Sequence, residues 1–207
     1  MLAKVDLNLS DGMKKYFLMT ALAAGMLFTG CGSKNTAETA TDVAEAAPAD
    51  STILVAYYSA TGTTAKAAKE ISEATGGTLY EIVPEEVYTE ADLNYENENS
   101  RSAVENRNPK MRPAIKTGLD ITPYKKVYVG FPVWWDKAPL VVYTFLDSYN
   151  FSDKEIIVFA TAHSSGLNPS FEALKQAYPS YNFTEGNILN INKSTENNFN
   201  EWVKSLK

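Results

Sequence analysis

The chain has 207 residues, of which 44% are hydrophobic, and this suits a single domain with a tail and a sizeable core. The formal net charge of −6 at pH 7 argues against nucleic acid as a partner, because phosphate backbones are bound by clustered Lys and Arg. A single cysteine and a single histidine leave no disulfide and no Cys/His metal site, so any redox chemistry has to come from a bound cofactor.

The first 30 residues predict a targeting segment. Residues 1–12 fit no structural pattern, but Met13 begins a basic stretch that an apolar run follows over residues 16–28. This order is typical of a secretory signal, and the run is shorter than the ~20 residues that a membrane span needs. The run ends in Leu-Phe-Thr-Gly-Cys at residues 27–31, which resembles the lipobox of bacterial lipoproteins.

The lipobox resemblance implies that Cys31 is lipidated after the signal peptide, residues 1–30, is cleaved. Several acyl chains would then hold the protein at a membrane surface of the cell envelope without spanning it. An ordinary cleaved signal with a coincidental cysteine is the alternative. Residues 31–50 are rich in Ala, Thr, Glu and Asp and poor in large apolar side chains, so they predict a flexible tether. The globular domain is expected at residues 51–207.

This domain opens with a strand, a turn and a helix that together predict an anion site. Residues 53–58 are an unbroken apolar run, which indicates a strand buried on both faces, as in parallel sheets. Residues 65–75 carry alanines and Ile71 at helical spacing, and Gly76 supplies a C-terminal stop. The turn between them brings free backbone N–H groups and the positive end of a helix dipole to one point.

The turn is rich in hydroxyl groups and has no basic residue; it comprises Ser59, Ala60, Thr61, Gly62, Thr63 and Thr64. It has neither the Gly-Lys-Ser/Thr ending of a P-loop nor the glycine pattern of a dinucleotide fold, and its neutral donors suit a phosphate monoester. The pattern Ser-x-Thr-Gly-x-Thr after a buried first strand resembles the FMN-phosphate loop of the flavodoxin family. The resemblance implies that these residues bind the phosphate of FMN. A Ser/Thr-rich turn with a structural N-cap is the alternative.

A second strand is predicted at residues 78–83, and a long polar segment follows at residues 84–113. Structureless loops of this length are uncommon in compact domains and are often functional, and we expect a short helix around residues 100–106. An Asp-Leu pair, a Ser-Arg-Ser run and an Arg-Pro pair give the segment a resemblance to the corresponding part of flavodoxin-like lipoproteins. No chemistry follows from these residues.

Residues 127–133 predict the third strand, which two adjacent tryptophans follow before Pro139 opens a helix. Adjacent side chains at a strand end point in different directions, so at least one indole should be partly exposed. In the flavodoxin family this loop contacts the isoalloxazine ring. The pattern Gly-Phe-Pro-x-Trp-Trp-x-x-Ala-Pro therefore implies that the ring is lined by Pro132, Val133, Trp134 and Trp135. An aromatic corner that packs the core is the alternative.

Electron-transfer flavodoxins often carry a glycine after the third strand, and its peptide can turn toward the flavin in the one-electron-reduced form. Trp135 and Asp136 occupy this place here. A side chain makes such a rotation more costly than glycine does, so the resemblance implies little accumulation of the one-electron form.

Residues 155–160 predict the fourth strand, and Asn168 and Pro169 indicate the cap and the first position of the next helix. Relatives usually carry a glycine-rich Thr-Ser-Gly-Gly-Ser-Gly loop between them, against the flavin. The resemblance implies that this loop lies near the pyrimidine edge or the ribityl chain. The candidate flavin contacts in it are Thr161, His163, Ser164, Ser165 and Gly166.

His163 and Ser164 stand where glycines are usual, and positive φ angles are harder to hold there. His163 is also the only histidine of the chain. It is a candidate proton donor or charge partner for reduced flavin, and the alternative is an ordinary solvent-exposed histidine in a loop.

A fifth, interrupted strand is expected at residues 181–183 and 187–191, and a last helix begins near Ser194. Five strands alternating with helices predict an α/β fold, a flavodoxin-like three-layer sandwich with a five-stranded parallel sheet in the order 2-1-3-4-5. In that order, the loops after strands one, three and four meet at the carboxyl edge of the sheet, where ligands of such folds bind.

Three functions remain open from the sequence. The first is an FMN-binding protein that transfers electrons to a redox partner protein at the cell envelope. The second is an oxidoreductase that uses NAD(P)H to reduce quinones or nitro compounds. The third is a non-redox binding module on the same fold, because fold alone does not decide function. No metal is expected at the site.

Overall fold

The computed structural model describes residues 52–192 and 196–207. Five parallel strands form one sheet in the order β2-β1-β3-β4-β5, as predicted. The strands are β1 (Ile53–Tyr57), β2 (Thr78–Glu81), β3 (Lys126–Pro132), β4 (Glu155–Ala162) and β5 (Asn182–Asn190). The helices are α1 (Thr63–Thr75), α2 (Arg101–Arg107), α3 (Leu140–Ser148), α4 (Asn168–Ala177) and α5 (Glu196–Lys204).

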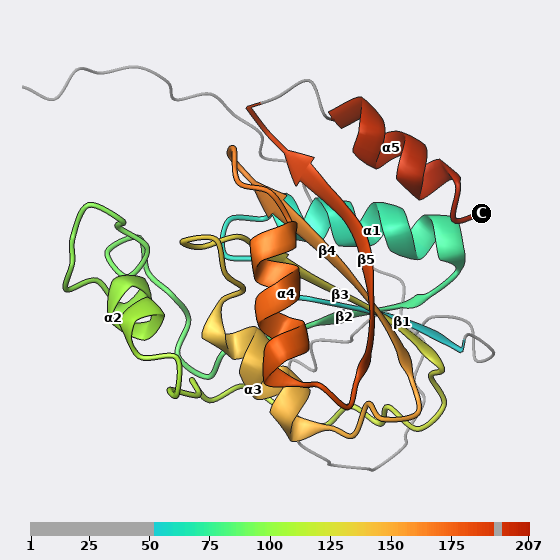
Figure 1. The fold of residues 1–207 in the computed structure, drawn as a ribbon, viewed down its shortest axis with the longest axis horizontal. Helices are drawn as coiled ribbons and strands as arrows, with labels where there is room; N and C mark the ends of the chain where they lie inside the picture. The colour runs from blue at the N-terminus through green and yellow to red at the C-terminus, as the bar shows by residue number, and fades with distance from the viewer. Residues whose placement is uncertain (1–51, 193–195) are drawn as a thin grey trace, which may run out of the picture. The chain divides into compact units, whose positions relative to one another are not determined.

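The helices cover both faces of the sheet, so the fold is the expected three-layer sandwich (Figure 1). Successive residues of β1 serve opposite faces, because side chains alternate along a strand. Leu54 belongs to the apolar cluster formed with α3 and α4, whereas Val55 belongs to the cluster formed with α1 and α5. Both residues are fully buried, which explains the unbroken apolar run of this strand.

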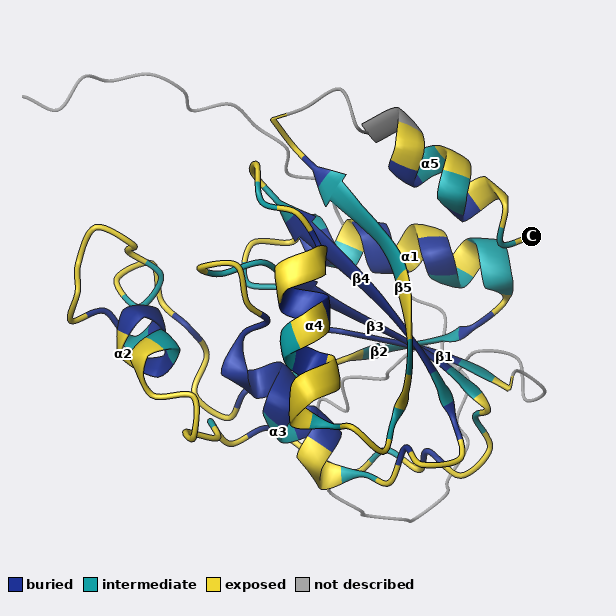
Figure 2. Ribbon diagram, viewed as in Figure 1, coloured by how far each residue is buried: buried dark blue, intermediate teal, exposed yellow. Residues whose placement is uncertain are grey.

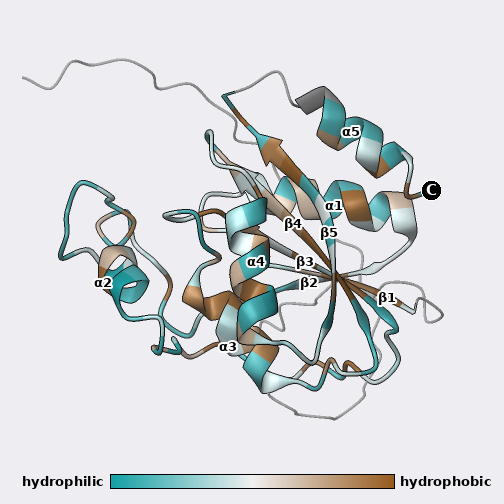
Figure 3. Ribbon diagram, viewed as in Figure 1, coloured by the Kyte–Doolittle hydropathy of each residue, from teal (hydrophilic) through white to brown (hydrophobic). Residues whose placement is uncertain are grey.

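Burial follows this layering. The central strands and the sheet-facing sides of α1, α3 and α4 are buried, while their outer faces are exposed (Figure 2). Hydropathy matches burial in β4 and α3, where the apolar residues are also the buried ones (Figure 3). In the described part of the chain, no helix is both long enough and apolar enough to cross a membrane.

The segment 84–113 is an ordered excursion. An antiparallel bridge between Pro84 and Ile115 closes its base. The expected short helix is α2, and its N-cap is Ser100, whose hydroxyl accepts a hydrogen bond from the Ala103 N–H group. The excursion lies beside the carboxyl-edge loop that follows β3, which gives it a place at the site described below (Figure 1).

Two expectations about the second half of the domain were wrong in detail. The fifth strand is continuous over Asn182–Asn190, because a register shift against β4 between Val158 and Ala160 absorbs the polar, glycine-containing stretch. Helix α4 begins at Asn168, so this residue is the first of the helix rather than its cap, and Leu167 stands before it. The expected helix start near Ser194 lies outside the described residues.

Candidate functional site

Three loops at the carboxyl edge of the sheet are joined by direct contacts. The hydroxyl oxygens of Thr64 and Thr161 lie 2.7 Å apart and connect the loops after β1 and β4. The N–H group of Val133 donates to the carbonyl oxygen of Thr161 at 2.8 Å, which connects the loops after β3 and β4. The rings of Tyr58 and Trp134 meet edge to face with centroids 5.7 Å apart. The structure therefore brings together the three stretches that the sequence singled out.

The loop after β1 presents unpaired donors. Gly62 caps α1 with φ 87°, and its N–H group donates to Ser59 Oγ at 3.1 Å. The next N–H groups, of residues 63–65, have no acceptor among the described residues, and no side chain caps the helix. Helix α1 has 13 residues, so its dipole adds positive potential at this point. The geometry is that of an anion site built from neutral groups.

The hydroxyls of this loop do not all face outward. Thr61 is exposed and Thr63 is half-buried. Thr64 is 1% exposed, and its hydroxyl is paired with that of Thr161. In this structure the Thr64 hydroxyl ties two loops together, while Ser59, Thr61 and Thr63 are less buried; the expectation that all four hydroxyls serve an anion stays a prediction. Ala60 is half-buried and packs against the core.

The two tryptophans after β3 have different environments. Trp134 is half-buried and lies in an aromatic cluster, with ring centroids 5.7 Å from Tyr58 and 5.3 Å from Tyr88. Trp135 is 39% exposed, which confirms that at least one of the pair is accessible. Trp134 thus forms the aromatic corner, and Trp135 offers an open indole face. Pro132 and Val133, beside them, are half-buried.

A hydrogen-bonded group supports the aromatic cluster from the excursion. The Tyr88 hydroxyl donates to Glu105 Oε2 at 2.6 Å, and Arg101 Nε donates to Glu105 Oε1 at 2.9 Å. The Arg101 guanidinium also lies 4.0 Å from the centre of the Tyr88 ring. Burial, followed by the hydrogen bond to Glu105, raises the pKa of Tyr88 above its usual value. Burial likewise raises the pKa of Tyr58, so both rings are neutral at physiological pH.

The tryptophan loop turns sharply. Trp134 and Lys137 exchange two backbone hydrogen bonds of 2.9 and 3.0 Å, and the residues between them, Trp135 and Asp136, have φ angles of 47° and 59°. Two successive positive φ angles define a type I′ turn, which usually contains Asn or Gly. The buried hydroxyl of Ser170 on α4 donates to the Asp136 carbonyl oxygen at 3.0 Å and fixes the turn.

The loop after β4 is held from β5. The Asn190 side-chain amide donates to the Ser165 carbonyl oxygen at 3.2 Å, and Asn190 Oδ1 is buried without a hydrogen-bond partner in the described structure. His163 is exposed, with Nδ1 at 3.2 Å from the Asn192 side-chain amide. Ser164 and Gly166 are also exposed.

No residue of this loop has a positive φ angle, so the side chains of His163 and Ser164 cause no backbone strain there. The role of His163 in proton transfer stays a prediction.

Sequence reasoning missed Tyr58, Tyr88, Ser170 and Asn190. Tyr88 lies in the excursion, and Ser170 lies near the start of α4, where it faces the tryptophan turn. No local sequence pattern marks either residue. Their positions depend on how distant segments pack. Among the described residues, no group of three or more His, Cys, Asp or Glu could hold a metal ion.

The fold and the site define a class of protein: a doubly wound α/β protein with an anion site and an aromatic wall at the carboxyl edge of its sheet. The sequence model of the flavodoxin family matches residues 52–206, and the chain belongs to this family. None of the curated proteins matches the chain.

Solved structures give the same assignment. A protein from Bacteroides uniformis that is assigned as a flavoprotein is 43% identical, with a TM-score of 0.69 over 73% of this chain and 97% of the other. A similarly assigned protein from Bacteroides eggerthii is also 43% identical, with a TM-score of 0.67 over 74% and 96% of the two chains. A flavoprotein from Lactobacillus acidophilus, solved in complex with FMN, is 21% identical, with a TM-score of 0.56 over 71% and 97%.

Proposed function

We propose that this protein binds FMN and serves in electron transfer or flavin-dependent reduction at the cell envelope. The observation that carries the proposal is the junction of the three loops, which joins an anion site of neutral donors to the tryptophan loop through the contact of Tyr58 with Trp134. A phosphate monoester attached to a flat conjugated ring has the complementary chemistry. The flavodoxin fold and the FMN complex of the Lactobacillus acidophilus flavoprotein support it.

The residues divide into three groups in this proposal. The N–H groups of residues 63–65 and the hydroxyls of Ser59, Thr61 and Thr63 hold the phosphate, and Gly62 shapes the turn. The ring is lined by Pro132, Val133, Trp134 and Trp135. The loop at residues 161–166 lies toward the ribityl chain or the pyrimidine edge. Bound FMN supplies one- or two-electron transfer, while the protein sets its potential through stacking, burial and hydrogen bonds.

The first test is titration of the full-length protein with FMN and with riboflavin, followed by quenching of flavin fluorescence. FMN is expected to bind stoichiometrically, and riboflavin, which lacks the phosphate, more weakly by at least tenfold. Equal affinity would remove the phosphate role of the loop after β1. Absence of binding by either flavin would overturn the redox proposal and favour a non-redox binding module.

An electron carrier and a reductase differ in one further measurement. Turnover of the FMN-loaded protein with NADPH and a quinone or nitroaromatic acceptor is expected to be slow for a carrier, which exchanges electrons with a protein partner. Sustained turnover would establish the reductase instead. The exposed indole of Trp135 leaves room for either partner at this edge.

The envelope location rests on the sequence, since Cys31 lies outside the described residues. We infer that Cys31 is acylated after cleavage of residues 1–30. Metabolic labelling with an alkyne fatty acid in the native host is expected to mark the wild-type protein and not Cys31→Ser. A labelled Cys31→Ser variant, or an unlabelled wild type, would contradict this inference.

A further inference from the structure

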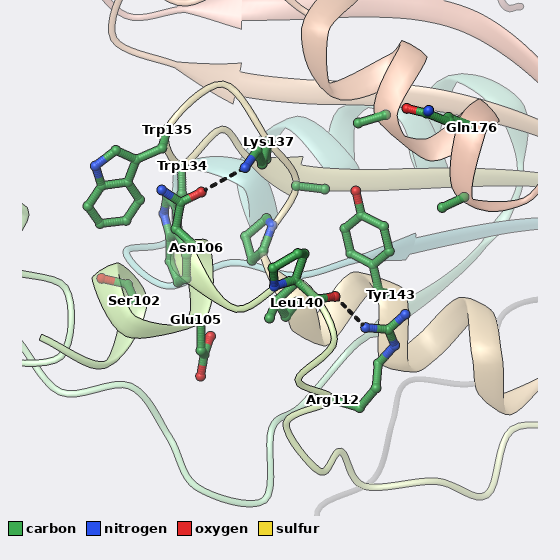
Figure 4. A pocket seen from close by; sticks show the side chains of 15 residues that line it. Ser102, Glu105, Asn106, Arg112, Trp134, Trp135, Lys137, Leu140, Tyr143 and Gln176 are labelled. Carbon is green, nitrogen blue, oxygen red and sulfur yellow. Dashed lines mark hydrogen bonds between the residues drawn. The ribbon is translucent and has the colours of Figure 1, made fainter.

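A separate cavity of about 300 Å³ lies between the tryptophan turn, the excursion and helices α3 and α4 (Figure 4). It is bordered by residues of all four, and by none from the anion loop at residues 59–64 or the loop at residues 161–166. The two tryptophans border it as well, so one loop serves both places. The function proposed above uses these two tryptophans but none of the other walls of the cavity.

The walls of the cavity are mainly apolar and aromatic. Trp135 lies at one end, the ring of Tyr143 lies toward the other, and Leu140 lies between them (Figure 4). Pro139 also borders the cavity. Ala173 and Ala177 of α4 leave space on the opposite side because their side chains are small. A volume near the lower end of ordinary ligand pockets, with aromatic walls, suits a compact planar molecule.

A hydroxyl inside the cavity has no partner. Tyr143 is only 9% exposed, and its hydroxyl makes no hydrogen bond to any described residue. Figure 4 shows this hydroxyl turned toward α4, on which the side-chain amide of Gln176 also borders the cavity. This hydroxyl is not among the buried unsatisfied atoms of the described residues, so it is open to the cavity, and a ligand acceptor would replace water as its hydrogen-bond partner. The cavity therefore offers hydrogen-bond donors for a ligand.

The uncompensated charge of the cavity is positive. The Lys137 ammonium group donates to the neutral amide oxygen of Asn106 at 3.2 Å and has no ion-pair partner in the described part of the chain. The other charges are balanced, because Arg112 pairs with Asp147 and the buried Glu105 pairs with Arg101. The Arg112 guanidinium also donates hydrogen bonds to two backbone carbonyl oxygens, so fewer of its N–H groups are left for a ligand.

We propose that this cavity binds a small aromatic carboxylate. The carboxylate accepts hydrogen bonds from the Lys137 ammonium group and the Tyr143 hydroxyl, and the aromatic body lies among the apolar walls that end at Trp135. A charge-assisted hydrogen bond of this kind is among the stronger single contacts in proteins.

The test uses 1-naphthoate as the probe and the neutral 1-naphthalenemethanol as its analogue, in calorimetric titrations of the full-length protein. Naphthoate is expected to bind at one site per chain, and the neutral analogue at least tenfold more weakly. Lys137→Gln should weaken naphthoate binding tenfold or more, and Tyr143→Phe about threefold to tenfold. Lys116→Gln is the matched control, because this lysine is exposed and does not border the cavity, and it should bind like the wild type.

Three results would overturn the proposal: no saturable binding at millimolar naphthoate, equal affinity for the two probes, or wild-type affinity in both Lys137→Gln and Tyr143→Phe. Each titration is repeated with saturating FMN. Unchanged naphthoate affinity is expected, and competition by FMN would place the probe in the flavin site and overturn the separate cavity. Circular dichroism shows whether each variant folds. If a variant does not fold, the comparison of the two probes on the wild type still tests whether binding depends on the carboxylate.

Discussion

The hydroxyl oxygens of Thr64 and Thr161 lie 2.7 Å apart, although the two residues are separated by 97 positions in the sequence. Both residues are buried, so one hydroxyl donates a hydrogen bond to the other where little solvent is available to replace it. This single contact joins the start of α1 to the end of β4. It holds together the two loops between which the proposed cofactor would lie.

Replacing one partner of this pair is expected to cost more than replacing both. Thr64→Val or Thr161→Val leaves one buried hydroxyl unpaired and should lower the free energy of unfolding by about 1–3 kcal/mol. The double variant has no unpaired group, and its loss should be clearly smaller than the sum of the two single losses. Urea unfolding of the four proteins measures the difference. Additive losses would show that the hydroxyls do not depend on one another.

Gly62 and Gly76 form a matched pair at the two ends of α1. Both have positive φ angles, 87° and 65°, and a Cβ added at either would meet no atom within 4 Å. Gly62→Ala and Gly76→Ala should therefore each cost about 1–2 kcal/mol of stability through backbone strain alone. Only Gly62→Ala is expected to weaken FMN binding in fluorescence titrations. An equal loss of affinity in Gly76→Ala would mean that general destabilisation, rather than the turn, controls binding.

The type I′ turn at Trp135 and Asp136 opposes a peptide rotation. Rotating the peptide between these residues would convert the turn to type II′, and this puts Trp135 in a conformation that essentially only glycine adopts. Photoreduction of the FMN-loaded protein is therefore expected to yield little one-electron-reduced flavin. Trp135→Gly should increase that fraction, with Trp135→Ala as the control that removes the indole but keeps a Cβ. Abundant one-electron form in the wild type would contradict the prediction.

The Tyr88 hydroxyl predicts an alkaline limit to stability. Its folded-state pKa is raised above 10 by burial and by Glu105, so the folded protein favours the neutral phenol. The Tyr88 hydroxyl makes its full contribution to the free energy of unfolding below pH 10. This contribution is lost as the pH rises above 10, because Tyr88 in the unfolded chain gives up its proton at a lower pH than in the folded protein. Tyr88→Phe should cost about 1.5–3 kcal/mol at pH 7, because Glu105 loses a donor, and should show a shallower decline above pH 10. Urea unfolding at pH 7 to 11 tests both effects, and an unchanged alkaline slope would refute the second.

The sheet order followed from the alternation of strands with helices and from the flavodoxin resemblance. The first strand and the position of the anion site could be predicted because they depend on local patterns. The unbroken apolar run before Ser59 indicated a central parallel strand, and the turn after it indicated an anion site. That at least one of the two adjacent indoles is exposed followed from geometry at a strand end, and the exposed one is Trp135. These local features are each determined within a few residues of chain.

The remaining features depend on contacts between distant segments. The pairing of Thr64 with Thr161 could not be foreseen, because all four hydroxyls of the loop look equivalent in the sequence. Gly130 on β3 carries no local sign of its role, yet the Phe159 ring on β4 occupies the space that its Cβ would need. Tyr88 reaches Trp134 only because the excursion folds back over the carboxyl edge.

The direction of β1 has a consequence for how the site is presented. The chain enters the sheet at Ile53 and reaches the site after Tyr57, so the entry point and the site lie at opposite ends of the same strand. Five residues of strand separate them by about 17 Å. The chain therefore enters the sheet at the edge opposite the three loops. A segment that continues from this end of β1 does not have to pass the site.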